Sequence, residues 1–122
     1  MNLIDQAFGI HSQALELRSK RVEVISRNIA NADTPNYKAQ DIDFKSVLQK
    51  TLMQKESGMT AGQVSPGDGL KYRIPFNVAF DGNTVELNIE QAQFGKSAAD
   101  YQATLNILEN RISGIRRALR GD

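Results

Sequence analysis

Residues 28–37 read NIANADTPNY, and this stretch decides where the first long helix of the chain ends. Pro35 lacks a backbone N–H and its ring disfavours helical geometry at Thr34, so we expect the helix to end at or before Asp33. The side chains of Asp33 and Asn36 can hydrogen-bond local backbone groups, which favours a tight turn. The small alanines and the amide side chains of the same stretch indicate close approach by another segment.

Residues 37–44, YKAQDIDF, complete a block that resembles the flagellar basal-body rod proteins, most closely their proximal (B-type) rod subunits. The usual family form is N-[LI]-A-N-A-D-T-P-G-Y followed by K-A-x-D-[IL]-D-F, and Asn36 replaces the glycine here. Both residue types accept the left-handed conformation that a turn can require. Residues 72–75 and 81–85 are similar to a second signature of the same proteins.

The resemblance implies that the motif turn lies at a contact between subunits. The motif residues are Asn28, Ile29, Ala30, Asn31, Ala32, Asp33, Thr34, Pro35, Asn36, Tyr37, Asp41, Asp43 and Phe44. The second signature consists of Tyr72, Arg73, Pro75, Asp81, Gly82, Asn83 and Thr84.

Composition limits the possible functions. The 122 residues suffice for one domain or for two helical arms with a connector. The chain has no cysteine, which excludes disulfides and cysteine nucleophiles, and its formal charge of +1 gives no electrostatic basis for binding nucleic acid. No apolar run approaches the ~20 residues of a membrane helix, and the N-terminus does not read as a cleavable secretory signal. We expect no cofactor, metal or small-molecule ligand.

Residues 1–33 are predicted to form one helix of about 30 residues, roughly 45 Å long. An apolar seam on it repeats in alternating steps of four and three, as in a heptad pattern. The apolar members of this seam are Ile4, Phe8, Leu15, Val22, Ile25 and Ile29. A second line, spaced by seven, consists of Leu3, Ile10, Leu17 and Val24. The apolar surface is therefore wide enough to contact more than one neighbouring helix.

Residues 88–120 are predicted to form a second long helix, with Asn88 as its N-cap and Gln91 at the capping-box position. Gly95 costs about 1 kcal/mol relative to alanine, so the helix is expected to be firm from Ser97. Its packing seam also repeats in steps of three and four. The members of this seam are Ala98, Tyr101, Leu105, Leu108, Ile112, Ile115 and Leu119.

Between the two long helices we expect three segments. They are residues 34–54 with the motif turn and a short helix, residues 55–69 as a flexible connector, and residues 70–87 as extended arms with a turn. The arms alternate apolar and polar residues over 70–74 and 76–80, which leaves room for a short β-hairpin.

Four polar residues raise the question of chemistry. His11 and Arg18 fall on the first seam. They either set the register between subunits or lie beside the core with their polar ends in water. We favour the second alternative, because one histidine offers no set of metal ligands. Asp41 and Asp43 resemble a carboxylate pair for acid–base or metal chemistry, but N-capping and turn formation explain them better.

The predicted fold is mainly α: two long heptad helices at the chain ends pack as an antiparallel, coiled-coil-like pair, and the middle is extended or irregular. One partner helix covers only one of the two apolar lines on the first helix. Each large side chain left in water forgoes about 1.5–3 kcal/mol. The remaining surface predicts assembly with further copies or related chains.

The family resemblance implies a non-enzymatic structural subunit of the proximal rod, which assembles through its terminal helices into the hollow axial drive shaft of the bacterial flagellum. It implies as partners other copies, other rod proteins, the rod-to-ring adaptor, the membrane-supramembrane ring and the export gate. It also implies a periplasm-spanning location, reached through the flagellar type III apparatus without a cleavable signal.

Two other classes of function are alternatives. A cytoplasmic coiled-coil adaptor or regulator would use the same two seams; the heptads do not exclude it, whereas the block at residues 28–44 argues against it. A small hydrolase has almost no support, since the chain has one histidine, no cysteine and no nucleophile elbow or metal-ligand spacing.

Overall fold

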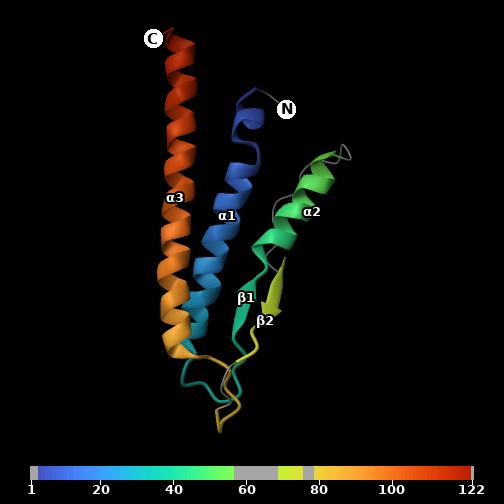
Figure 1. Cartoon of the computed structure of the whole chain (residues 1–122), viewed down its shortest axis with the longest axis vertical. Helices are drawn as coiled ribbons and strands as arrows, with labels where there is room; N and C mark the ends of the chain where they lie inside the picture. The colour runs from blue at the N-terminus through green and yellow to red at the C-terminus, as the bar shows by residue number, and fades with distance from the viewer. Residues whose placement is uncertain (1–2, 57–68, 76–78, 122) are drawn as a thin grey trace.

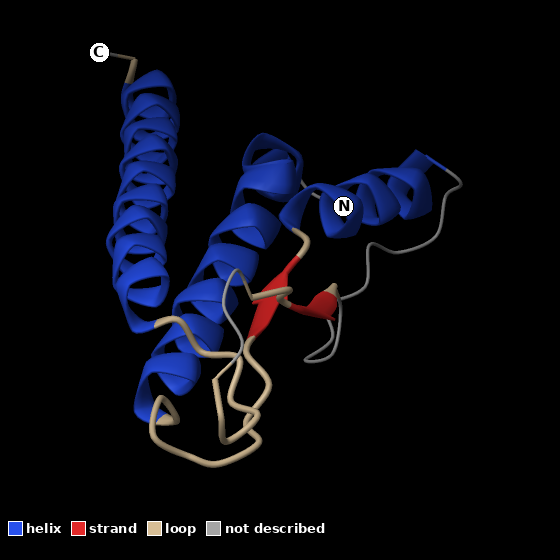
Figure 2. Ribbon diagram, turned by 60° about the horizontal axis from the view of Figure 1, so that its bottom comes forward, coloured by secondary structure: helices blue, strands red, loops and turns tan. Residues whose placement is uncertain are grey.

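The computed structural model describes residues 3–56, 69–75 and 79–121. Its elements are, in order, α1 (Leu3–Ala30), β1 (Gln40–Ile42), α2 (Phe44–Glu56), β2 (Leu70–Tyr72) and α3 (Leu87–Arg120). Helices α1 and α3 run antiparallel side by side, and α2 and the small sheet lie on the other flank of α1 (Figures 1 and 2). The predicted mainly α fold with paired terminal helices is confirmed.

Helix α1 ends at Ala30, within the limit that Pro35 sets. The amide of Asn31 still donates to the carbonyl oxygen of Arg27, and the chain then enters the turn. Gly9 departs from helical geometry (φ 40°, ψ −125°) and kinks α1 near its start, which the uninterrupted heptad pattern did not predict. The side chains of Ile4 and Phe8 precede this kink and lie outside the described part of the structure.

The apolar core lies between α1, β1 and α2. Its buried members are Leu17, Val24, Ile42 and Val47, with Phe44, Leu48 and Leu70 packed against them. Leu17 and Val24 belong to the second apolar line of the first helix, so the middle of the same chain covers the described part of this line. The sequence predicted that one of the two lines stays uncovered, and for Leu17 and Val24 this was wrong, because a helix–strand segment packs on α1 in addition to the partner helix. On the first seam, Ile25 is fully buried.

The face of α3 that is buried against the rest of the chain differs from the predicted seam. The buried residues of α3 are Glu90, Ser97 and Thr104, which are spaced by seven. Ala98, Ile112 and Leu119 are instead exposed, and the other four seam residues are half-buried. The predicted apolar seam is therefore not the line along which α3 is buried against the rest of the chain. Short serine and threonine side chains permit close approach, and the buried Glu90 is held by polar partners described below.

The two strands pair across a long stretch of chain. β1 is antiparallel to β2, with Gln40 opposite Tyr72 and Ile42 opposite Leu70. A hairpin within residues 70–80 was the wrong pairing for β2, because the free edge of the motif segment provides its partner. Residues 76–78, in the other arm of that hairpin, lie outside the described residues, as does 57–68 of the predicted connector.

The start of α3 also differs from expectation. The helix begins at Leu87 with Glu86 as its N-cap and no side-chain capping bond, so Asn88 is not the cap. It continues without interruption through Gly95, although glycine disfavours a helix by about 1 kcal/mol. Glu90 and Gln93, in the first two turns, contact other segments of the chain. The boundaries of the predicted segments differ by a few residues from those of the elements, and the division into domains remains a prediction.

Candidate functional site

The motif turn and the second signature meet at the end of α1, where Asn83 holds the turn. The Asn83 side chain is buried, and its Nδ2 lies 2.9 Å from the carbonyl oxygen of Asn31, 3.0 Å from that of Ala32 and 2.7 Å from that of Thr34. Carbonyl groups at a helix end have no intrahelical partner. The Asn83 amide, 49 to 52 residues further along the chain, shares its two N–H groups among these three oxygens.

Backbone contacts join the same two segments. The amide of Asn36 donates to the carbonyl oxygen of Asp81 at 2.9 Å, and that of Thr84 donates to the carbonyl oxygen of Tyr37 at 2.9 Å. The amide of Ala39 donates to Thr84 Oγ1 at 2.7 Å. We call the contact of residues 31–39 with residues 81–85 the motif clamp.

Two positions in the motif clamp require unusual backbone geometry. Asn36 has a positive φ of 62°, so the left-handed conformation expected of it is present. Gly82 has a φ of 76°, and a Cβ there would collide with Asn36 Oδ1. The Gly82 carbonyl oxygen also accepts a hydrogen bond from Lys38 Nζ. Glycine is therefore favoured at position 82 by its positive φ, whereas the oxygen that a Cβ would meet is the end of an exposed side chain.

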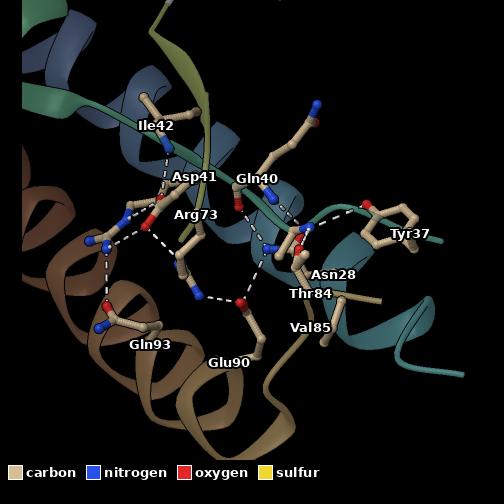
Figure 3. A network of polar contacts seen from close by, with 12 residues as sticks. Asn28, Tyr37, Gln40, Asp41, Ile42, Arg73, Thr84, Val85, Glu90 and Gln93 are labelled. Atoms are coloured by element: carbon tan, nitrogen blue, oxygen red, sulfur yellow. Dashed lines mark hydrogen bonds and ion pairs between the residues drawn. The ribbon is translucent and has the colours of Figure 1, made fainter. Parts of the chain in front are cut away.

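Asn28, the first residue of the motif, is fully buried and connects three segments (Figure 3). Its Nδ2 donates to the Gln40 carbonyl oxygen at 2.7 Å and to Glu90 Oε2 at 3.1 Å. Its Oδ1 accepts from the Gln40 amide at 3.1 Å and from the Tyr37 hydroxyl at 3.5 Å. Asn28 thus fixes the start of β1 and the first turn of α3 to α1.

Charged side chains continue from Asn28 into a network between the sheet and both long helices (Figure 3). Arg73 pairs with the fully buried Glu90 and, at 2.7 Å, with Asp41 Oδ2. Asp41 Oδ1 also accepts from Arg21 Nε at 3.0 Å, and Arg21 Nη2 donates to Gln93 Oε1 at 3.0 Å. We call these residues, with Asn28, the polar network. Its buried carboxylate, Glu90, and its half-buried carboxylate, Asp41, are both paired, as burial of a charge requires.

The protonation of Asp41 depends on this network. Burial by itself would raise the pKa of the carboxyl group, but hydrogen bonds from Arg21, Arg73 and the Ile42 amide, with the charge of Arg21, lower it more, so the pKa lies below its ordinary value of 3.8. Asp41 is therefore an ion-pair residue of the sheet, and its assignment to capping or a turn was wrong.

Asp43 does cap a helix, as predicted. Its Oδ1 accepts from the Ser46 amide at 3.3 Å at the start of α2. Its Oδ2 accepts from Lys71 Nζ at 2.8 Å. These two contacts lower the pKa of the Asp43 carboxyl group.

Arg18 lies in a different environment from the one we expected. Its guanidinium group stacks 4.2 Å from the centre of the Phe44 ring and lies 3.4 Å from Asp100 Oδ2. The polar end therefore contacts α2 and α3, and the side chain is 26% exposed. A guanidinium stacks on an aromatic face more favourably than an ammonium does.

The remaining motif positions divide between a buried side and a solvent side. Those that face solvent are Ala30, Asp33, Thr34, Pro35 and Asn36, and of the second signature Tyr72 and Asp81. Those that are half-buried are Ile29, Asn31, Ala32, Tyr37, Phe44, Pro75 and Thr84. The structure thus brings the two signatures together and leaves the outer surface of the turn accessible.

Sequence reasoning missed three members of the polar network: Arg21, Glu90 and Gln93. Arg21 and Gln93 have no distinguishing local pattern. Glu90, however, begins the series Glu90, Ser97, Thr104 at the heptad spacing, and this repeat of non-apolar residues was a usable signal.

The polar side chains of this site are engaged with one another, so the arrangement acts mechanically: it joins both long helices and the sheet. Among the residues that the structure describes, no group of three or more histidine, aspartate or glutamate side chains could hold a metal ion. Within the same residues, no helix combines the length and apolar character needed to cross a membrane.

Comparison with known proteins identifies the relatives of this chain. A family model described as "Flagella basal body rod protein" matches residues 8–38. The flagellar basal body rod protein FlgB of Aeromonas hydrophila is 42% identical over 97% of this chain and 96% of its own length. FlgB of Escherichia coli strain K12 is 37% identical over 98% of this chain and 97% of its own length, and FlgB of Salmonella typhimurium is 36% identical over 99% and 98%.

Fold and site together define a class of proteins in which paired terminal helices are joined at one end by a buried polar network. The chain belongs to the flagellar basal body rod protein family, and its curated relatives are the FlgB proteins. It is a structural subunit of the flagellar rod, located in the basal body.

Proposed function

We propose that this rod subunit occupies the proximal part of the rod and assembles there through α1 and α3 into the hollow axial drive shaft needed for motility. Its role is mechanical: it transmits torque and continues the export conduit. The similarity to FlgB proteins over nearly the whole chain supports this proposal, together with the short middle segment between the two long helices.

The observation that carries the proposal is the uncovered apolar surface on the C-terminal half of α3. Ile107 is 46% exposed, Ile112 36% and Leu119 80%. α3 extends past the N-terminal end of α1 (Figure 1), so α1 does not cover its last turns. Since each large apolar side chain left in water forgoes about 1.5–3 kcal/mol, neighbouring helices would gain by covering this surface.

The solvent side of the motif turn is a second proposed contact between subunits. Its inner side chains are occupied by the motif clamp, which keeps the turn in one conformation. Asp33, Thr34 and Pro35 remain exposed and available to a neighbour. The assembly role of the motif is thereby restricted to these outer residues, and residues such as Asn28 serve to position them.

Membership of the family supports a proposal for the partners and the export route of this chain. We propose contacts with other rod proteins, the rod-to-ring adaptor, the membrane-supramembrane ring and the export gate. We further propose that the chain reaches a periplasm-spanning position through the flagellar type III apparatus, without a cleavable signal. We expect no enzymatic activity, cofactor or nucleic-acid partner.

The test is deletion of the gene for this chain followed by purification of basal bodies. We expect the deletion to abolish motility and rod formation, and the re-expressed chain to co-purify with basal bodies at the end of the rod next to the membrane ring. Motile deletion cells, or basal bodies without the chain in complemented cells, would refute the proposal. Localisation to the distal rod would refute only the proximal assignment.

A further inference from the structure

The motif clamp contains an Asp–Gly pair, Asp81–Gly82, which has an intrinsic covalent reactivity. The backbone nitrogen of the residue after an aspartate can attack the carboxyl carbon Cγ of that aspartate and close a five-membered succinimide ring. Glycine favours this attack, because it has no Cβ to hinder its nitrogen and its backbone adopts more conformations than that of any other residue. Asp81 is exposed, so water can reach the ring and open it.

The reaction leaves the mass of the chain unchanged. The bond from Gly82 N to Asp81 Cγ forms, the bond from Cγ to a carboxyl oxygen breaks, and the amide proton leaves with the carboxyl OH as one water molecule. A second water molecule then opens the ring at either of its two carbonyl carbons. Opening at Cγ returns aspartate. Opening at the main-chain carbonyl carbon gives isoaspartate, in which the main chain runs through Cβ and Cγ and is one carbon longer.

The closed motif clamp holds both polar atoms of the peptide group between Asp81 and Gly82. Its carbonyl oxygen accepts from the Asn36 amide at 2.9 Å, and its N–H donates to the Ala79 carbonyl oxygen at 3.1 Å. Attack requires the nitrogen to turn toward Asp81 Cγ and to give up its proton, and both changes break the hydrogen bond to Ala79. The closed clamp therefore opposes the reaction at the nucleophile.

The carboxyl group of Asp81 is held as well. Its Oδ1 accepts from the Asn83 backbone amide at 3.0 Å, which is the contact of an Asx-turn and directs this oxygen to the nitrogen two residues along the chain. The Asn83 side chain is buried and lies 2.7 Å from the Thr34 carbonyl oxygen. The partner of the carboxyl group thus belongs to the buried part of the clamp.

The turn depends on both residues of the reactive pair. Gly82 has a φ of 76°, which favours glycine, and Asp81 supplies the acceptor for the Asn83 amide. The residue types that build the clamp are therefore the ones that make this position reactive.

We propose that Asp81–Gly82 is a covalent modification site controlled by the motif clamp: aspartate is retained while the clamp is closed, and isoaspartate forms when the clamp is open or before the chain has folded. In the isoaspartate form the former main-chain carbonyl group becomes the side-chain carboxylate. The oxygens that accept from Asn36 and Asn83 then exchange roles, so both hydrogen bonds cannot be kept and the modified turn does not close. The site is independent of the proposed rod function.

Ageing of the purified full chain tests this control. Wild-type protein is incubated at physiological temperature and mildly acidic pH, either folded in buffer or unfolded in guanidinium chloride. Digestion with a protease that cleaves before aspartate but not before isoaspartate, followed by mass spectrometry, separates position 81 from the second Asp–Gly pair at residues 68–69. We expect isoaspartate at position 81 to form at least about tenfold more slowly in the folded chain, because only open clamps react. Equal rates, or no isoaspartate at position 81 in the unfolded chain, would overturn the proposal.

Asn83→Ala opens the clamp without changing the reactive pair. Under native conditions we expect isoaspartate at position 81 to form at least about tenfold faster than in the wild type, because the open clamp is more populated. Asn106→Ala is the matched control: Asn106 is exposed in the C-terminal half of α3, so the rate should equal that of the wild type. A wild-type rate in folded Asn83→Ala would contradict control by the clamp.

Circular dichroism shows whether Asn83→Ala is folded. If it is not, Lys38→Met takes its place, because Lys38 is exposed and its Nζ donates to the Gly82 carbonyl oxygen. This substitution removes one outer contact of the clamp and leaves the core intact. We expect isoaspartate to form about threefold faster in it, as loss of one hydrogen bond implies. An unchanged rate in Lys38→Met would then overturn the proposal.

The effect of the modification is measured on the aged protein. Ion-exchange chromatography separates the chain with isoaspartate at position 81 from the unmodified chain, and urea unfolding compares the two. We expect a lower unfolding midpoint for the modified chain, because its clamp stays open. Equal midpoints would show that the clamp closes over isoaspartate and would refute that effect. None of these measurements involves basal bodies, so their failure leaves the rod assignment unchanged.

Discussion

Asn83 illustrates how a single side chain can hold a turn together. Its amide lies within hydrogen-bond distance of three carbonyl oxygens of the motif turn, and its Oδ1 accepts from the Val85 amide at 2.7 Å. Asn83 is 4% exposed, so its side chain makes these contacts away from bulk water. The residue belongs to the second signature, so the family pattern at this position reflects the geometry of the turn.

Asn83→Ala is therefore expected to destabilise the protein by at least about 2 kcal/mol, since each buried polar group left unsatisfied costs ~1–3 kcal/mol. Urea unfolding followed by circular dichroism measures the change. The matched control is Asn106→Ala: Asn106 is exposed on α3 and accepts one hydrogen bond from Gln102, so its loss should change stability by less than about 0.5 kcal/mol. Equal effects of both substitutions would contradict the role of Asn83.

Asp41 makes stability depend on pH. Its pKa in the folded protein lies below 3.8, so its contribution to stability is fully present above that value and is lost as pH falls through the folded-state pKa. The free energy of unfolding should therefore decrease on acidification below about pH 4, and Asp41→Asn should have a shallower decrease. Unfolding measured at several acidic pH values decides this. Parallel pH curves for wild type and variant would exclude Asp41 as a source of the acid sensitivity.

At the scale of elements, the polar network determines how α1, the sheet and α3 are joined. The buried line of α3 consists of Glu90, Ser97 and Thr104, which contribute little apolar area. The start of α3 is therefore held to the rest of the chain largely through Arg73 and Asn28, both of which contact Glu90.

Arg73→Met removes the cation that faces Glu90 and Asp41. We expect a loss of about 3 kcal/mol or more, because removal of one partner leaves a buried charge uncompensated. Lys71→Met is the matched control two residues earlier, in β2, since Lys71 is mostly exposed in its pair with Asp43 and such pairs contribute ~0–1 kcal/mol. Chemical denaturation of both variants gives the comparison. A loss from Arg73→Met as small as that from Lys71→Met would show that the network does not hold α3.

For the whole molecule, the structure separates residues that build the subunit from residues that are free to build the assembly. Ile25 is fully buried within the chain, whereas Leu119 is 80% exposed. A charge at either position would prevent rod assembly, but for different reasons.

Leu119→Asp is expected to leave the monomer folded and to abolish incorporation into rods, because the charge would have to be buried against a neighbour. Ile25→Asp is expected to unfold the monomer itself. Circular dichroism of the purified variants and motility of the complemented deletion strain test both expectations. Motile cells carrying Leu119→Asp would show that the C-terminal half of α3 is not an assembly surface.

Much of the fold could be predicted from the sequence because its determinants are local. Pro35 stops α1, heptad spacing identifies both long helices, and Asp43 caps α2. The motif residues were found for the same reason, as a continuous block. The side of α1 covered by the middle of the chain could not be predicted, because periodicity reveals an apolar line but not the element that packs on it.

By itself, the sequence determined the number, type and approximate ends of the long helices, the left-handed turn at Asn36 and the family. These follow from backbone sterics and from side-chain periodicity within a few residues. Only the tertiary structure decided that β1 pairs with β2, that Asn83 closes the motif turn and that Glu90 meets Asn28 and Arg73. Asn28 and Glu90 are 62 residues apart, and their contact depends on the packing of complete elements, which no local pattern records.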